Sequence, residues 1–114
     1  MTAHYVGAAT PITSPVSMNG AYAEGTCGFT STYSTATTRH PVSSTKTVIA
    51  YAYGYNGGII GQLSMSSTVQ GTGSNPVTAD AYTIFPITGA KGYHKVVWSS
   101  MTWSDYSTIG ILSN

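Results

Sequence analysis

The chain has very few charged side chains, which make up 6% of its 114 residues, whereas soluble domains average about 25%. Four of them are basic and three are acidic, so the formal net charge is +1. Proteins that bind nucleic acid or anionic membranes rely on clustered lysine and arginine. The composition therefore excludes a broad basic surface, and we expect neither nucleic acid nor a membrane as a partner.

Cysteine is almost absent, because Cys27 is the only one. No disulfide can form within the chain, which excludes a small scaffold held together by disulfides. Free cysteines are usually buried and behave as small apolar residues, and we expect this of Cys27. The alternative is a disulfide to another chain. A length of 114 residues suits one domain with its own core, so we assign residues 1–114 to a single domain.

Helical periodicity and long apolar runs are also missing. No window of helix length repeats apolar residues every three to four positions, and no run is long enough to span a membrane. The first residues lack the basic and apolar regions of a secretory signal. What remains are short runs of β-branched and aromatic residues separated by Gly, Pro and Asn, which favour strands. We predict an all-β fold, an antiparallel sandwich or jelly-roll-like barrel of about seven to eight short strands.

The clearest local signal is Asn56-Gly57-Gly58, which lies between two runs that favour strands and predicts a tight hairpin. With a two-residue loop, Val48, Ala50, Ala52 and Gly54 share one face of the first strand. The second strand would continue that face with Ile59, Gly61, Leu63 and Met65. The opposite face of the first strand then carries three tyrosines in alternation.

Other segments are assigned by composition. Cys27–Thr38 is rich in threonine and aromatics and predicts one strand, and Tyr93–Trp103 predicts a long strand. Glycine or aspartate suggests turns at Glu24-Gly25, at residues 88–92 and at residues 105–107.

Catalytic and metal-binding motifs are missing from the sequence. The three carboxylates, Glu24, Asp80 and Asp105, are scattered, and a glycosidase needs two that flank one bond. The three histidines, His4, His40 and His94, show no metal-ligand spacing. No Gly-x-Ser-x-Gly nucleophile motif occurs. We expect no enzyme activity, no metal site and no cofactor.

Aromatic residues are the most informative group. Tyr51, Tyr53 and Tyr55 lie on one face of one strand, and Trp98 and Trp103 raise the same question of what they pack against. The tyrosines could cover a second core, or they could form a protein interface or a platform for sugar rings. At least one tryptophan is expected in the core. These five residues are our candidates for an interface or ligand platform.

Low charge and abundant aromatics lead to two functional hypotheses. Copies of this chain repel one another little, so we expect a structural subunit of a homopolymeric assembly, such as a virion or phage-tail component or an extracellular filament. Its partners would be copies of itself, and it would be extracellular or on a virion surface. Residues 1–15, interrupted by Pro11, could be an arm that pairs with a neighbour's sheet edge. The alternative is a small glycan-binding β-sandwich that uses tyrosine and tryptophan platforms.

Overall fold

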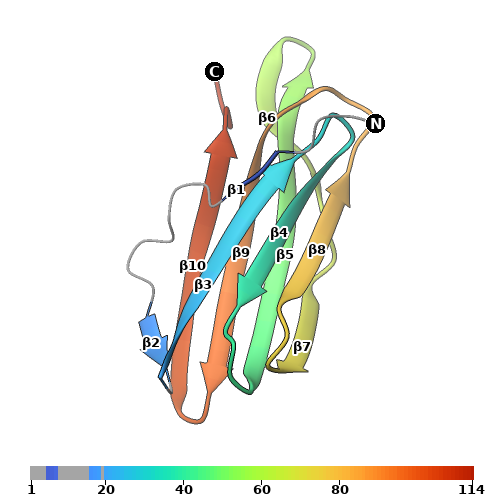
Figure 1. The fold of residues 1–114 in the computed structure, drawn as a ribbon. Coiled ribbons are helices and arrows are strands. Elements are labelled where there is room, and N and C mark those ends of the chain that lie inside the picture. The colour runs from blue at the N-terminus through green and yellow to red at the C-terminus, as the bar shows by residue number, and fades with distance from the viewer. Residues whose placement is uncertain (1–4, 8–15, 19) are drawn as a thin grey trace.

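The structure, a computed structural model, describes residues 5–7, 16–18 and 20–114. Its regular elements are all strands, ten in the described residues (Figure 1). They are β1 (Tyr5–Gly7), β2 (Val16–Met18), β3 (Ala21–Phe29), β4 (Tyr33–Arg39), β5 (Ser44–Asn56), β6 (Ile59–Met65), β7 (Val69–Gly73), β8 (Val77–Tyr82), β9 (Ile87–Trp98) and β10 (Met101–Gly110). The predicted all-β class is confirmed.

The strands form two antiparallel sheets that pack face to face as a sandwich. Sheet 1 has the order β1-β3-β4-β8, with β2 also paired to β3, and sheet 2 has the order β10-β9-β5-β6, with β7 also paired to β5. Figure 1 shows sheet 1 in front of sheet 2. The chain changes sheet between β4 and β5, between β7 and β8, and between β8 and β9. Each long strand therefore has an inner and an outer face, and side chains alternate between them.

The predicted hairpin joins β5 to β6. Gly57 and Gly58 form its two-residue loop with φ angles of 67° and 84°, a region that glycine adopts without steric cost. Beyond the loop the register shifts, so that Tyr53 lies opposite Gln62 while Ala52 lies opposite Ser64. Because of this irregularity, the side chains at the end of β6 point to the opposite face of the sheet from the one that was predicted. The prediction that Met65 shares the face of Ala52 was therefore wrong, because Met65 lies opposite Tyr51.

Three predicted turns are strand interiors. Residues 24–25 lie within β3, residues 88–92 within β9 and residues 105–107 within β10. Glycine at two of these positions allows neighbouring groups to approach closely. A Cβ at Gly25 would lie 2.2 Å from the His94 ring, and one at Gly89 would lie 2.7 Å from the carbonyl oxygen of Ile111. Sequence alone does not distinguish such a glycine from a turn glycine.

Two predicted strands were each too long. Cys27–Thr38 is divided by a turn at residues 30–32, where the Thr30 amide donates a hydrogen bond to the carbonyl of Tyr33 (2.8 Å). Tyr93–Trp103 is divided at Ser99 and Ser100, and Ser99 has a φ of 55°. The second break places Trp103 directly opposite Val96 on the inner face of sheet 2.

Two apolar clusters fill the interior formed by the described residues. The alanine cluster consists of Cys27, Ala36, Val48, Ala50, Ala52, Ala79, Ala81 and Ala90. The tryptophan cluster consists of Ala23, Val96 and Trp103, with Trp98 packed against it. Since β9 carries Ala90 in one cluster and Val96 in the other, His94 lies between them. Cys27 is a free, buried cysteine, as expected, with 1% of its surface exposed.

The assignment of residues 1–15 to an arm concerns a segment that lies mostly outside the described residues. Within it, Tyr5–Gly7 forms β1 and pairs antiparallel with Cys27–Phe29 of β3 in the same chain. Contact of this segment with another chain stays a prediction.

Candidate functional site

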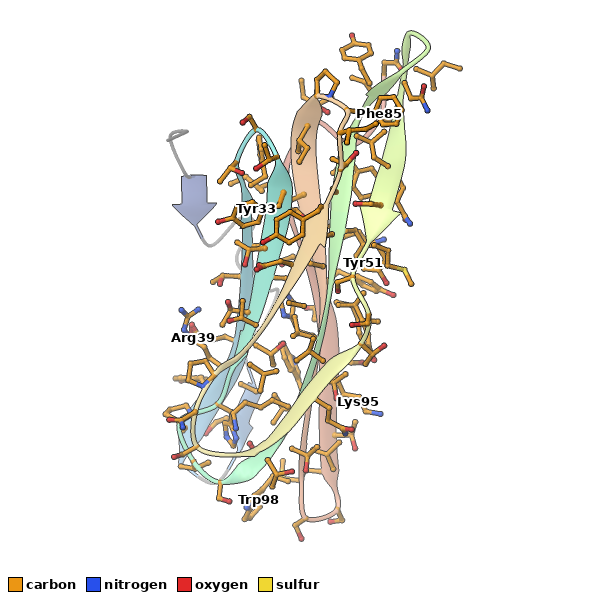
Figure 2. The ribbon with its side chains drawn as sticks, turned by 90° about the vertical axis from the view of Figure 1, so that its right-hand side faces the viewer. Tyr33, Arg39, Tyr51, Phe85, Lys95 and Trp98 are labelled. Atoms are coloured by element: carbon orange, nitrogen blue, oxygen red, sulfur yellow. The ribbon has the colours of Figure 1, made fainter. Side chains whose placement is uncertain are left out.

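The outer face of sheet 2 carries the three predicted tyrosines. Alternation along β5 turns Ala50, Ala52 and Gly54 inward, so Tyr51, Tyr53 and Tyr55 point outward. Tyr51 and Tyr53 are half-buried, while Tyr55 is 46% exposed. Figure 2 shows Tyr51 on one side of the sandwich and Arg39 on the other. The tyrosines therefore do not lie between the two sheets.

Two more tyrosines join them from neighbouring strands. Tyr93 of β9 lies opposite Ile49 of β5 and opposite Tyr106 of β10, and the Tyr93 and Tyr106 ring centroids are 5.3 Å apart. We call this set the tyrosine face: Tyr51, Tyr53, Tyr55, Tyr93 and Tyr106, five of the nine tyrosines in the chain. Sequence reasoning missed Tyr106 because it placed that residue in a turn. The aromatic and β-branched residues Tyr106, Thr108 and Ile109, which favour a strand, were the sequence signal that could have found it.

One lysine lies within the tyrosine face. Lys91 Nζ is 4.5 Å from the ring centroid of Tyr106 and 5.3 Å from that of Tyr51, within the range of a cation–π interaction. Burial raises the pKa of Tyr51, and the neighbouring phenols of Tyr106, Tyr53 and Tyr93 raise it further. The Tyr51 phenol therefore stays protonated at neutral pH. A second lysine, Lys95, lies on the same outer face two residues beyond Tyr93 on β9.

The two tryptophans do not belong to the tyrosine face. Trp103 is 6% exposed and lies in the core with Ala23 and Val96, which confirms that at least one tryptophan is core. Trp98 is partly buried at the end of β9 and packs against the same cluster (Figure 2). Trp103 is thus closed to a partner, and only Trp98 keeps an accessible edge.

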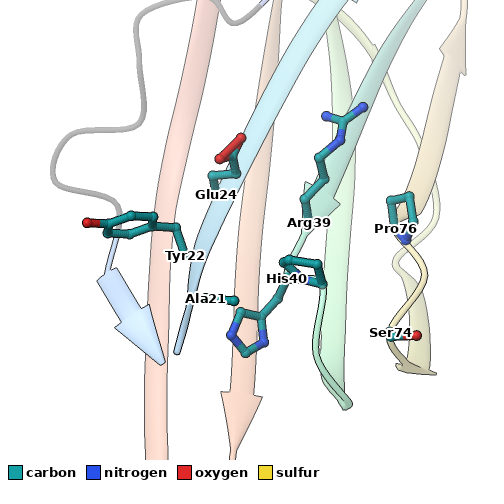
Figure 3. A pocket seen from close by; sticks show the side chains of 8 residues that line it. Ala21, Tyr22, Glu24, Arg39, His40, Ser74 and Pro76 are labelled. Atoms are coloured by element: carbon teal, nitrogen blue, oxygen red, sulfur yellow. The ribbon is translucent and has the colours of Figure 1, made fainter. Parts of the chain in front are cut away.

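A pocket of about 390 Å³ opens at the end of the sandwich where β3 begins and β4 ends. We call it the end pocket, and Figure 3 shows its lining residues: Ala21, Tyr22, Glu24, Arg39, His40, Pro41, Ser74 and Pro76. The β3–β4 ladder ends at the pair Glu24 and Arg39. Below that pair the two strands separate, and prolines, which lack an amide hydrogen, do not extend the pairing. The pocket occupies the resulting gap.

Glu24 and Arg39 are neighbours across the ladder, yet the structure places no ion pair between them. Arg39 Nη1 donates a hydrogen bond to Thr26 Oγ1 (3.0 Å), which leaves other guanidinium N–H groups for a ligand. Figure 3 shows the Glu24 carboxylate and the Arg39 guanidinium extending in the same direction from adjacent strands. The pocket therefore presents an acceptor and a donor of opposite charge.

A hydrogen-bonded cluster supports the wall formed by His40. Ser44 Oγ lies 2.8 Å from His40 Nδ1 and 3.2 Å from the carbonyl oxygen of Val42, so it hydrogen-bonds to the imidazole ring and to the backbone. Lys46 Nζ donates to Ser44 Oγ (3.2 Å), to Ser44 O (3.4 Å) and to Gly73 O. Lys46 is fully buried, and burial lowers its pKa. Three oxygens accept from its three N–H groups, and the cluster holds the imidazole ring in one orientation.

His94 belongs to a second buried cluster, which we call the polar layer, with Thr38 and Ser107. Thr38 Oγ1 donates to the carbonyl of Thr47 (2.9 Å), so it accepts from the Nδ1 hydrogen of His94 (2.9 Å). His94 Nε2 then accepts from the Ser107 hydroxyl (2.7 Å). Burial lowers the pKa of His94 to about 4, and the Asp105 carboxylate opposes that shift. All three side chains are fully buried, so the layer holds the sheets together and cannot reach a substrate.

The remaining candidates for chemistry lie apart from one another. Glu24 is on β3, Asp80 on β8 and Asp105 on β10. His40 and His94 belong to the two separate clusters described above, and His4 lies outside the described residues. No group of three His, Cys, Asp or Glu side chains that could hold a metal ion occurs within residues 5–7, 16–18 and 20–114.

Comparisons with models of protein families, with curated proteins and with solved structures give no significant match. The part of the chain that the structure describes has no helix that is long and apolar enough to cross a membrane. The functional argument therefore rests on the tyrosine face and the end pocket.

Proposed function

We propose that this protein is a structural subunit of a homopolymeric assembly and that copies associate through the tyrosine face. The observation that carries the proposal is the concentration of five of nine tyrosines on one outer sheet face. Tyrosine is enriched at protein interfaces, because its ring buries a large apolar area while its hydroxyl still forms hydrogen bonds. A virion or phage-tail component or an extracellular filament would be an assembly of this kind.

The low charge of this face supports a second copy as its occupant. Two lysines of β9 lie on it: Lys91, whose charge lies over the rings of Tyr51 and Tyr106, and Lys95, two residues beyond Tyr93. The repulsion between two such faces is that of a few lysines, and salt screens it. The exposed residues around the tyrosines include Met65, which is 56% exposed and lies opposite Tyr51. Exposed apolar side chains of this kind suit self-association.

The magnitude of the burial favours assembly through repeated contacts. Tyr55 and Tyr106 are 46% and 50% exposed, so each has roughly 100 Å² left to bury, worth on the order of 2 kcal/mol per ring. Association costs at least about 4 kcal/mol in lost freedom of motion. One pair of faces therefore gives modest affinity, and several contacts per subunit make an assembly stable.

The sheet edges offer such further contacts. β10 has ten residues and pairs only with β9 among the described strands. It contains neither proline nor lysine, the residues that commonly protect an edge strand from pairing with another chain. An edge of this length could extend the sheet of a second copy, next to Tyr106 on the same strand.

The test compares the same charge placed on the two outer faces. In the double variant Tyr55→Glu with Met65→Glu, two carboxylates enter the tyrosine face at exposed positions. The control is Tyr82→Glu with Thr78→Glu, which adds the same charge to exposed positions on the outer face of sheet 1. Sedimentation velocity measures particle mass, and circular dichroism checks that each variant is folded.

We expect large particles from the unmodified chain and from the control, and single folded chains from the tyrosine-face variant. A single-chain species from the unmodified protein at high concentration and physiological salt contradicts the proposal. Equal particle mass for both double variants also contradicts it, because the contact would then lie elsewhere.

A further inference from the structure

The end pocket gathers an unusual share of the few charged residues in this chain. Glu24 and Arg39 line it, and Lys46 lies behind it, joined to the His40 wall through Ser44. Only four basic and three acidic residues occur among all 114. These residues belong neither to the tyrosine face nor to the two apolar clusters. We therefore consider the function of the pocket separately.

The form of the pocket suits a small molecule. Its volume of about 390 Å³ lies within the range of small-molecule sites. Ala21, Pro41 and Pro76 supply apolar walls, and the Tyr22 side chain, 60% exposed, stands at its side (Figure 3). An exposed aromatic ring beside apolar walls is a surface on which the C–H face of a sugar ring packs.

The polar groups of the pocket distinguish between classes of ligand. The Glu24 carboxylate accepts hydrogen bonds and the Arg39 guanidinium donates them, and their charges oppose each other. A hydroxyl group donates and accepts at once, so neighbouring hydroxyls of one sugar ring satisfy both side chains. A simple anion would be repelled by Glu24 and a simple cation by Arg39, whereas a zwitterion or an uncharged ligand with several hydroxyl groups is opposed by neither. The apolar walls and the exposed ring of Tyr22 favour the second of these, because they can pack against the C–H face of a sugar ring.

The cluster behind the pocket keeps one wall in place before a ligand arrives. His40 is fully buried and hydrogen-bonds to Ser44, while the hydrogen bonds of Lys46 hold Ser44 and the carbonyl of Gly73. A wall that is already ordered loses little freedom on binding, which increases affinity. Pro41 and Pro76 restrict the loops on either side in the same way.

We propose that the end pocket binds a neutral saccharide of one or two rings, held between Glu24 and Arg39 with a ring face against Tyr22. This site is separate from the tyrosine face, on the other side of sheet 1 from it, and it goes beyond the proposed assembly function. A subunit that assembles through sheet 2 would leave these pockets open along the assembly, where weak single contacts add together on a glycan-coated surface.

Saturation-transfer-difference NMR tests the proposal with the full chain, since it observes the ligand and works for particles of any mass. The probes are glucose, galactose, mannose, N-acetylglucosamine and their β-linked disaccharides. Sodium acetate and sodium glucuronate are the charged comparators. We expect saturation transfer to at least one neutral sugar, strongest at the protons of one ring face, and weaker transfer to both anions.

Variants then locate the site. Tyr22→Ala and Glu24→Gln should each weaken binding of that sugar about tenfold or more, since each removes a contact worth at least a factor of ten. Tyr82→Ala and Asp80→Asn are the matched controls, with an exposed tyrosine and an exposed carboxylate on the same face of sheet 1, outside the pocket. Their binding should equal that of the unmodified chain.

Four outcomes overturn the proposal. They are no transfer to any neutral sugar, transfer to the anions alone, equal binding by all four variants, or a loss confined to the tyrosine-face variant Tyr55→Glu with Met65→Glu. The last outcome would place a glycan platform on sheet 2. Particle mass measured on Tyr22→Ala separates the two proposals, because assembly does not depend on the end pocket.

Discussion

The alanine cluster and the polar layer lie next to each other in one sandwich, and they fill the space between the two sheets in different ways. In the alanine cluster, small side chains from both sheets fill the interior and need no hydrogen bonds. In the polar layer, one large ring, His94, fills the space and must bond at both nitrogens. The ring fits because Gly25 and Gly92 have no side chains to oppose it. The polar layer thus depends on one large side chain. We therefore expect mutation of His94 and changes in pH to affect the stability of the fold most strongly at this layer.

The tryptophan cluster beyond the polar layer should show the largest effect of a single truncation. Trp103→Ala removes the largest side chain of that cluster and leaves a cavity beneath β9, and we expect a loss of about 4 kcal/mol in the free energy of unfolding. Urea denaturation measures it. Trp98→Ala is the control, since Trp98 is only partly buried and should lose about half as much. An equal loss of unfolding free energy in the two variants would contradict this prediction, because both rings would then contribute equally to the core.

The fit between glycine and the His94 ring predicts the next largest effect. A Cβ at Gly25 would lie 2.2 Å from His94 Cγ, so Gly25→Ala should cost about 3 kcal/mol through overpacking. Gly61→Ala on β6, where no atom lies within 4 Å of the added Cβ, should change stability little. Thermal or urea unfolding compares the two.

The double variant Gly25→Ala with His94→Ala sharpens this prediction. Removing the ring makes room for the new methyl group, so the double variant should be more stable than the sum of the two single losses implies. Strict additivity would contradict the assigned clash.

The polar layer also predicts a loss of stability in acid. The pKa of His94 falls from 6.5 to about 4 on folding, mainly through burial. Below pH 6.5 the His94 imidazole binds a proton in the unfolded state but not in the folded state. The free energy of unfolding therefore falls as the pH decreases from 6.5 to 4. The linkage gives a loss of about 2 kcal/mol between pH 7 and pH 5. Urea midpoints at the two pH values measure it.

Two variants test whether His94 is the cause. His94→Gln should be less stable at pH 7 but should lose this part of the pH dependence. Asp105→Asn removes the carboxylate that raises the pKa of His94, so its loss in acid should be at least as large as that of the unmodified chain. Equal stability of the unmodified protein at pH 7 and pH 5 would contradict the assignment.

Much of the architecture could be predicted from sequence. Turn chemistry at Gly57 and Gly58 located the β5–β6 hairpin, and alternation along β5 separated inward alanines from outward tyrosines. These are local properties, fixed by φ angles and by the two-residue repeat of a strand. The candidate site was found in part for the same reason, since Tyr51, Tyr53 and Tyr55 share one strand.

The end pocket and the remaining tyrosines could not be predicted in this way. Glu24 and Arg39 meet because β3 and β4 pair in one register, and Tyr106 reaches Tyr93 because β10 pairs with β9. Register between strands depends on how the whole sheet packs. The prediction missed the two-residue turn at Ser99 and Ser100, and this placed every later side chain of that segment on the wrong face.

The sequence by itself determined that this chain is an all-β sandwich with little charge and one strand of alternating tyrosines, because backbone propensity and side-chain alternation act over a few residues. Only the tertiary structure decided that Gly25, Gly89 and Gly92 are contact points and not turns, and that Lys46, His40 and His94 are buried with partners for their hydrogen bonds. A glycine beside a ring and a lysine among carbonyls are defined by residues far away in the chain. Their roles therefore appear only when the two sheets are brought together.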